Sequence, residues 1–184
     1  MSYFRRCAPA VAVALLCAAP AQCTILIKQD LKDLTAGAKA VVRAKVLSKT
    51  AGWDAERRFI WTTYELAVVD VWKGDVGPRL VLKELGGETG TTGMRVAGAP
   101  EYAVGQDVVT FLHVDPLGNW RTLGWTQGKA VVAPDAERPG SHVVITGHPH
   151  VFDALPKDEV RAPGLATLAG LRAKVVALAK AEAK

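Results

Sequence analysis

The chain has 184 residues, of which 49% are hydrophobic and 22% are charged, and its formal net charge is +5 at pH 7. This composition is typical of a globular protein and excludes a disordered chain, while three cysteines are too few for a disulfide-rich scaffold. The sequence has no concentrated basic run, so nucleic acid is not an expected partner.

Residues 1–23 are predicted to form a secretory signal peptide. Arg5 and Arg6 give this segment a positive beginning, and the apolar run over residues 8–16 is too short to cross a bilayer core about 30 Å thick. The small residues Ala19-Pro20-Ala21 are typical of a cleavage site. We therefore expect an exported protein, periplasmic or extracellular, with no transmembrane segment after signal removal.

The cysteines Cys7, Cys17 and Cys23 all lie within this first segment. Cleavage after Ala21 would leave Cys23 as a single exported thiol, and cleavage after Cys23 would leave none. The exported part is therefore expected to fold without disulfide bonds within the chain.

The chain that follows is predicted to begin with a short helix and a strand. Asp30 is a suitable N-cap for this helix, and Gly37 is a suitable residue to end it. Apolar and polar residues alternate over residues 41–47, which predicts a half-buried strand. The polar residues 53–58 then form a connecting loop.

A long β-rich run over residues 59–72 comes next. Its alternation slips near Val69, and such a slip predicts a β-bulge. A third strand is expected over residues 79–85. Residues 86–100 contain five glycines and no hydrophobic period, so they are predicted to form a long loop of the kind that is usually functional or mobile.

The second half of the chain is predicted to add four strands and a helix. The strands lie at residues 107–114, 120–126, 129–133 and 143–146, the last of them at a sheet edge. A polar linker over 156–164 leads to a helix over 167–184. The apolar stripe of this helix consists of Leu168, Leu171, Val175 and Leu178.

These elements predict a mainly β fold. We expect a small OB-like closed β-barrel over residues 24–155, with a short N-terminal helix, and a linker and C-terminal amphipathic helix over residues 156–184. A bulged strand can serve both sides of such a barrel. A β-sandwich is the alternative.

The order of several short motifs between Leu31 and Val132 resembles an uncharacterised family of exported bacterial β-proteins. The motifs are residues 41–46, 62–68, 72–74, 86–87, 96–100, 109–112 and 124–128. The resemblance implies membership of that group and export, and it implies no activity.

A second, more distant resemblance rests on Cys23-Thr24, residues 41–46 and residues 64–74. These are similar to the netrin-like N-terminal domain of tissue inhibitors of metalloproteinases, which has an OB-fold barrel. In that family the signal is removed directly before a cysteine, whose amino group and carbonyl chelate the protease zinc. The resemblance implies the barrel fold and, with Cys23 as the first residue, metalloprotease inhibition.

The leading functional prediction is a non-enzymatic domain that binds an unknown protein or glycan. The glycine-rich loop and a neighbouring tryptophan-bearing strand junction are the expected contact surface. Its candidate ligand-binding residues are Gly86, Gly87, Glu88, Arg95, Trp125 and Gln127. The loop lacks the lysine and hydroxyl residue that a phosphate-binding loop needs, and no cofactor or catalytic residue is predicted.

Histidine-based metal binding is a further alternative. His148 and His150 would point the same way in an extended segment, and His142 and Asp153 are near in sequence. A zinc ion needs three or four such ligands that converge on it. These histidines are weak candidates, and a solvated turn is the other interpretation.

Overall fold

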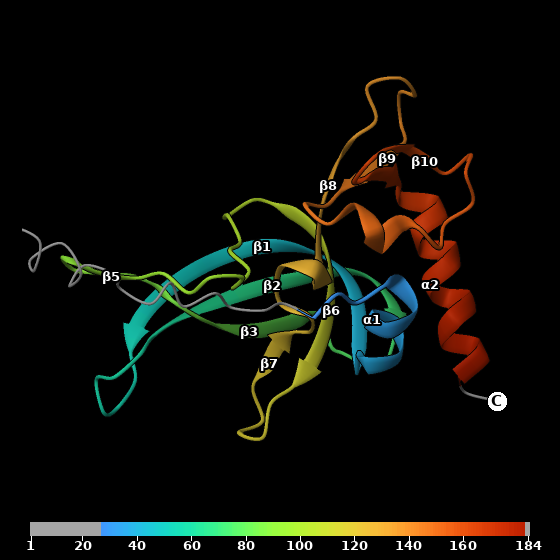
Figure 1. Cartoon of the computed structure of the whole chain (residues 1–184). Coiled ribbons are helices and arrows are strands. Elements are labelled where there is room, and N and C mark those ends of the chain that lie inside the picture. Colours follow the sequence, from blue (N-terminus) through green and yellow to red (C-terminus); the bar gives the residue numbers. More distant parts are fainter. Residues whose placement is uncertain (1–26, 183–184) are drawn as a thin grey trace, which may run out of the picture.

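The computed structural model describes residues 27–182. The predicted signal peptide, the three cysteines and residues 183–184 lie outside these residues. The described chain is mainly β, with α1 (Leu31–Gly37) before the strands and α2 (Leu168–Glu182) after them. In Figure 1 the long strands β1, β2 and β3 extend to one side, and the two helices lie together at the other end.

The short helix α1 begins at the predicted cap. The Asp30 carboxylate accepts the Asp33 backbone N–H at 2.9 Å, and the Asp33 carboxylate accepts the Asp30 backbone N–H at 3.3 Å. This reciprocal pair satisfies two backbone donors at the helix start. Leu31 and Leu34 are fully buried, so this helix turns an apolar face toward the core.

Five strands close into a ring. β1 (Ala40–Trp53) pairs antiparallel with β2 (Ile60–Lys73) and with β6 (Asp107–Val114). β3 (Arg79–Leu85) continues from β2, and β7 (Trp120–Thr122) joins β3 in parallel and β6 antiparallel. The order is therefore β1-β2-β3-β7-β6, returning to β1.

The β-bulge predicted near Val69 is present. Arg43 pairs with Asp70 and Ala44 pairs with Val68, so Val69 is left without a partner on β1. A bulge of this kind bends its strand and increases the local twist. The bend allows β2 to take part in both hydrophobic clusters of the molecule.

One hydrophobic cluster fills the ring, and the other lies between the sheet and the helices. The ring cluster consists of Ala40, Val42, Ala44, Val46, Tyr64, Leu66, Leu80, Leu82, Tyr102, Val108 and Leu112. The second cluster includes Leu31, Leu34, Val41, Trp72, Phe111, Val144, Phe152, Leu171 and Val175. On β2, Leu66 before the bulge belongs to the first cluster and Trp72 after it belongs to the second.

The sheet continues beyond the ring on the far side of β6. The added strands follow in the order β8 (Lys129–Pro134), β9 (His142–Ile145), β11 (Leu165–Thr167) and β10 (Val160–Ala162). The prediction that the strand near residue 143 is an edge strand is wrong, because β9 pairs with both β8 and β11. The predicted linker over 156–164 contains β10, which forms the edge instead.

Two further expectations are corrected. The segment 86–100 is not a structureless loop, since β4 (Gly87–Thr89) and β5 (Thr92–Met94) form a hairpin within it. The strand expected over 120–126 ends at Thr122. Gly124 has a left-handed φ of 68° that a strand does not adopt, and the 3-10 helix η1 (Trp125–Gly128) follows it.

The end of the chain returns to the sheet. A second 3-10 helix, η2 (Pro149–Phe152), precedes β10, and α2 contacts α1 and strands β2, β9 and β11. Lys73 at the end of β2 donates to the Thr35 backbone carbonyl at 2.6 Å and to Glu182 at 2.7 Å. This lysine therefore joins α1 and α2 to the ring.

Candidate binding cleft

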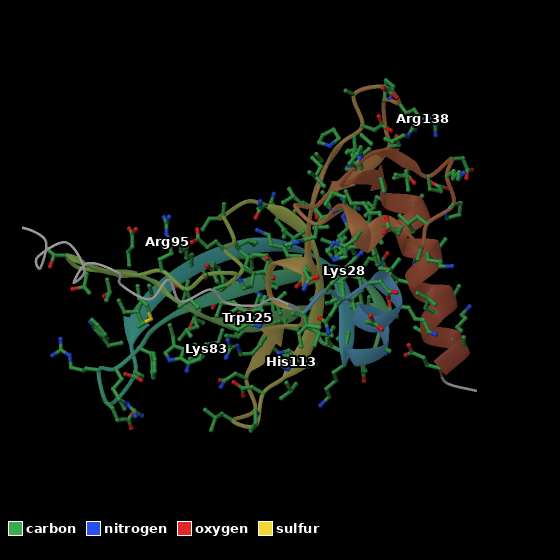
Figure 2. All side chains as sticks on the ribbon, in the orientation of Figure 1. Lys28, Lys83, Arg95, His113, Trp125 and Arg138 are labelled. Atoms are coloured by element: carbon green, nitrogen blue, oxygen red, sulfur yellow. The ribbon has the colours of Figure 1, made fainter. Side chains whose placement is uncertain are left out.

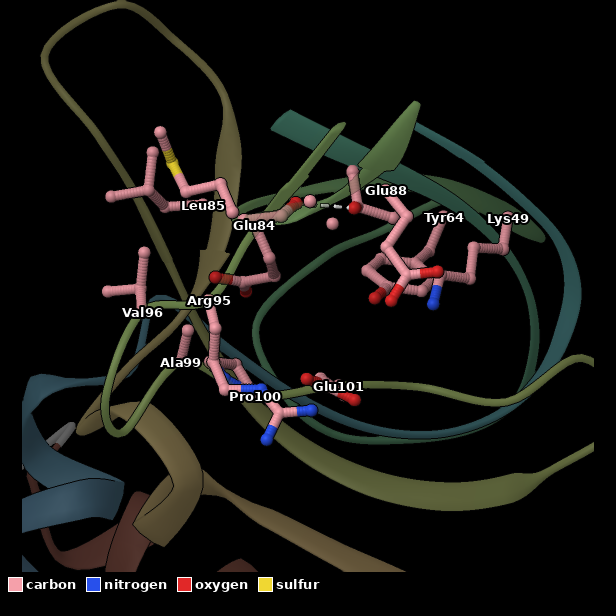
Figure 3. Close-up of a pocket in the computed structure, with 15 residues that line it drawn as sticks. Lys49, Tyr64, Glu84, Leu85, Glu88, Arg95, Val96, Ala99, Pro100 and Glu101 are labelled. Atoms are coloured by element: carbon pink, nitrogen blue, oxygen red, sulfur yellow. Dashed lines mark hydrogen bonds between the residues drawn. The ribbon is translucent and has the colours of Figure 1, made fainter. Parts of the chain in front are cut away.

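A cleft of about 350 Å³ opens where β3 leaves the ring and the β4–β5 hairpin begins. Figure 3 shows side chains of the strands on one side and of residues 95–101 across the opening. The lining residues are Lys49, Thr62, Tyr64, Glu84, Leu85, Gly86, Gly87, Glu88, Gly93, Met94, Arg95, Val96, Ala99, Pro100 and Glu101. We call this space the cleft.

Two glycines allow the chain to turn from β3 into the wall of the cleft. Gly86 and Gly87 have φ angles of 101° and 132°, which side chains disfavour. A Cβ atom at Gly87 would also collide with the Thr62 hydroxyl. That hydroxyl donates to the Gly86 carbonyl at 2.6 Å, so β4 lies tightly against β2.

Glu84 forms the floor of the cleft and is 3% exposed. Its Oε1 atom accepts the Thr122 backbone N–H at 2.7 Å, and its Oε2 atom lies 3.8 Å from Arg121 Nε, beyond hydrogen-bonding distance. Burial raises the pKa of Glu84 to about 7, although the Thr122 hydrogen bond and the Arg121 charge oppose this rise.

A buried hydroxyl network lies behind this floor. The Tyr102 hydroxyl lies 2.6 Å from the Thr122 hydroxyl and 3.0 Å from that of Thr110. Its ring meets the Tyr64 ring edge to face, with the centroids 5.1 Å apart. Burial raises the pKa of both tyrosines, so both rings stay neutral at physiological pH.

Charged side chains surround the mouth of the cleft. They are Lys49, Glu88, Arg95 and Glu101, and all four residues are exposed. None of them forms an ion pair with another of the residues 27–182. Close by, the Lys129 ammonium donates to the Glu101 backbone carbonyl and lies 4.5 Å from the Tyr102 ring centroid. Burial lowers the pKa of Lys129 to about 8.

Four of the six predicted ligand-binding residues line the cleft: Gly86, Gly87, Glu88 and Arg95. Trp125 and Gln127 are on η1 and do not line it. In Figure 2, Arg95 lies toward the left of the molecule and Trp125 lies nearer its middle. The two regions still meet, because the Thr126 backbone N–H donates to the Gly98 carbonyl at 3.1 Å.

Gln127 is 3% exposed and binds other parts of the chain. Its amide oxygen accepts the Gln29 backbone N–H at 3.0 Å, and its amide nitrogen donates to the Ile27 carbonyl at 2.9 Å. The same oxygen lies 2.9 Å from His150 Nε2. Gln127 therefore anchors the segment before α1, a role that its position in a turn did not reveal.

The two candidate metal-binding histidines lie near each other and contact η1. The His148 and His150 rings have centroids 5.9 Å apart. His148 Nε2 is 2.9 Å from the Thr126 hydroxyl. Among residues 27–182, no group of three or more His, Cys, Asp or Glu residues is placed to hold a metal ion.

Sequence reasoning did not select Glu84, Lys49, Tyr64 or Glu101. A signal for Glu84 was present, because Leu80, Leu82 and Glu84 occupy every second position of β3 and all three point inward. A carboxyl group in phase with buried leucines indicates a polar position inside the fold. Lys49 and Glu101 join the cleft only through tertiary pairing.

No protein-family model matches this chain, and no curated protein matches it. Within residues 27–182, no helix is long and apolar enough to cross a membrane.

Proposed function

We propose that this chain is an exported, non-enzymatic binding domain and that a segment of a partner protein docks in the cleft. Four charged side chains at the mouth, Lys49, Glu88, Arg95 and Glu101, carry this proposal, because they form no ion pair with the rest of residues 27–182. Two are positive and two are negative, and an extended peptide can place charges of either sign along one line. Complementary charges of this kind select a partner and speed its association.

The lining favours a protein segment over a glycan. Sugar rings commonly stack on exposed aromatic faces, and Tyr64, the one aromatic lining residue, is 2% exposed. The exposed Trp125 lies on η1, outside the cleft. Leu85, Met94 and Val96 instead supply apolar walls that suit the stem of a long side chain.

We further infer that the strand ring is an OB-like barrel. The ring order β1-β2-β3-β7-β6, the use of β1 on both sides and the parallel contact of β3 with β7 support this assignment. A five-stranded barrel of that type is partly open, and its loops commonly bind ligands. The resemblance to exported β-proteins and to netrin-like domains agrees with this inference and stays a prediction.

A peptide selection tests the proposed function. A random heptapeptide library is selected on the full exported chain, and the affinity of each selected peptide is measured by calorimetry. We expect the double variant K49E/R95E to weaken binding at least tenfold for selected peptides that carry acidic residues. The matched control, R57E/K180E, changes two exposed basic residues away from the cleft and should leave affinity within twofold.

Two results would contradict the proposal. Equal loss in the two double variants would show that net charge, and not the cleft, determines binding. A chain that selects no peptide but binds oligosaccharides on an array would have a glycan as its ligand.

The intact mass and N-terminal sequence of the exported protein test the export prediction. We expect cleavage within residues 19–24. A chain that begins at Cys23 without a lipid would instead favour metalloprotease inhibition through the new terminus. An uncleaved chain would contradict export.

A further inference from the structure

At the floor of the cleft, only one of the two carboxyl oxygens of Glu84 accepts a hydrogen bond from the described part of the chain. Glu84 is 3% exposed, and its Oε1 atom is occupied by the Thr122 backbone N–H. Its Oε2 atom accepts no hydrogen bond from residues 27–182, and its closest cation is Arg121, with Nε 3.8 Å away. Oε2 is not among the enclosed polar atoms of residues 27–182 that lack a partner, so it faces the space of the cleft, where water or a ligand group can reach it.

From its present position, Arg121 does not donate a hydrogen bond to Glu84 Oε2. Its guanidinium stacks on the Trp61 ring, with the carbon atom 4.8 Å from the ring centroid. Its buried Nε atom makes no hydrogen bond. The stacking holds the cation on the outer side of β3 and β7, while Glu84 Oε2 borders the cleft.

The walls of the cleft indicate what kind of donor fits. Leu85, Met94 and Val96 contribute apolar atoms to one side of a lining that is otherwise mostly polar. Figure 3 shows the Glu84 carboxyl group within the opening, with Glu88 and Glu101 further along its rim. A carboxyl group at the floor, two more on a rim that also carries Lys49 and Arg95, and an apolar side wall match a lysine or arginine side chain, which has an apolar stem and a charged end.

We propose that Glu84 is the specificity-determining residue of the cleft and receives a lysine or arginine side chain of the bound protein segment. The proposal rests on the proposed function and names the chemical class of its ligand. The cationic group donates to Oε2, while the Thr122 N–H keeps Oε1 in place. A charge-assisted hydrogen bond of this type is about twice as strong as a neutral one.

Binding is then coupled to pH. Burial raises the pKa of Glu84 to about 7, so the free cleft exchanges a proton near neutrality. A cation requires the carboxylate, and capture therefore releases a proton below pH 7. The other charged and titratable groups around the cleft are Lys49, Tyr64, Glu88, Arg95, Glu101, Tyr102, Arg121 and Lys129.

The test uses four blocked pentapeptides with alanine at the outer positions and lysine, arginine, norleucine or glutamine at the centre. Each is titrated into the full exported chain, and binding is followed by the Thr122 amide and Glu84 carboxyl NMR signals. We expect the lysine and arginine peptides to shift both signals and the norleucine and glutamine peptides to leave them unchanged. Lysine-peptide affinity should fall by on the order of 100-fold from pH 8 to pH 5.

Variants separate Glu84 from the rim. Glu84→Gln keeps an oxygen for the Thr122 N–H, and it should lose at least tenfold in lysine-peptide affinity and also the pH dependence. The matched controls Glu88→Gln and Glu101→Gln remove rim charges and should keep the pH dependence. The Thr122 amide signal of Glu84→Gln in the absence of peptide reports whether the variant is folded.

Each remaining outcome contradicts a different statement. Equal binding of norleucine and lysine peptides, or unchanged binding by Glu84→Gln, overturns the role of Glu84. Peptides that shift the Lys49 and Arg95 amides, but not Thr122, overturn that role and leave the proposed function intact. Oligosaccharides such as chitotetraose that shift the Glu84 signal, when peptides do not, overturn the protein ligand itself.

Discussion

Single residues show how burial changes the chemistry of this protein. Glu84 and Tyr102 lie at the junction of β3, β6 and β7, where few water molecules can reach them. The buried Tyr102 hydroxyl has two threonine hydroxyls as hydrogen-bond partners, whereas Glu84 has a hydrogen bond to only one of its carboxyl oxygens within residues 27–182. This difference gives Tyr102 a structural role and leaves Glu84 Oε2 open to the ligand group that we propose.

The titration of Glu84 is expected to make stability depend on pH. Burial raises its folded-state pKa from 4.5 to about 7, so the folded chain binds the proton more tightly than the unfolded chain. Its contribution to stability is therefore complete below pH 4.5 and is lost as pH rises through about 7. The loss is on the order of 3 kcal/mol.

Urea unfolding of the wild type and of Glu84→Gln at pH 4.5, 6, 7 and 8 measures this effect. The free energy of unfolding of the variant should change less over this range than that of the wild type. Parallel profiles would show that Glu84 does not titrate there.

The hydroxyl of Tyr102 is expected to stabilise the fold directly. Tyr102→Phe removes both of its hydrogen bonds and leaves two buried threonine hydroxyls with fewer partners, at a cost of about 1–2 kcal/mol. Tyr64→Phe is the matched control, since the two rings are in contact and Tyr64 lines the cleft, outside the pair of threonine hydroxyls that Tyr102 binds. Its free energy of unfolding should change by less than about 0.5 kcal/mol. Equal losses of unfolding free energy in Tyr102→Phe and Tyr64→Phe would contradict a stabilising role for the Tyr102 hydroxyl.

At the scale of elements, one hairpin determines the shape of the cleft. Within the described part of the chain, β4 and β5 pair only with each other, and β4 lies against β1 and β2. The approach is close because Gly87 has no side chain and the Thr62 hydroxyl donates to Gly86. The hairpin is therefore positioned by two glycines and one hydroxyl, and not by a hydrophobic core of its own.

Gly87→Ala is expected to displace the hairpin. The added Cβ would meet the Thr62 hydroxyl and the Ala51 side chain in a left-handed conformation, which should cost at least about 2 kcal/mol and weaken peptide binding. Gly90→Ala is the matched control at the hairpin turn. Its φ is also positive, at 59°, but no atom lies within 4 Å of the added Cβ, so about 1 kcal/mol is expected. Chemical denaturation and calorimetry measure the two effects, and a larger loss at Gly90 would contradict this account.

At the scale of the whole molecule, two hydrophobic clusters share strands β1, β2 and β6. Residues of β1 alternate between them, since Val41 packs against the helices and Val42 packs inside the ring. If these strands unfold, the buried residues of both clusters therefore become exposed to water. Ion pairs between Lys73 and Glu182 and between Arg172 and Asp70 add links from α2 to β2.

This sharing predicts one cooperative unfolding transition. Leu171→Ala removes a buried side chain of α2, and Leu82→Ala removes one from the ring, at a cost of about 2–4 kcal/mol each. In both variants, tryptophan fluorescence and far-UV circular dichroism should give coincident curves. Leu178→Ala, on the partly buried end of α2, should cost less. Separate transitions would show that the ring and the helix layer fold independently.

The sequence by itself determined the features that depend on near neighbours. The cap at Asp30, the strands over 79–85 and 107–114, the bulge near Val69 and the C-terminal helix all follow from local capping, alternation and period. Four ligand-binding candidates also share the cleft, because they belong to one continuous segment.

Only the tertiary structure decided what distant residues do together. The pairing of β3 with β7 brings Thr122 to Glu84, and the pairing of β1 with β2 brings Lys49 to Tyr64. Gln127 was expected to contact a ligand, yet it binds the chain near residue 29, about 100 positions away. Alternation can say which side of a strand is buried, but it cannot say which buried carboxyl is left without a donor. That depends on the packing of several strands around one point.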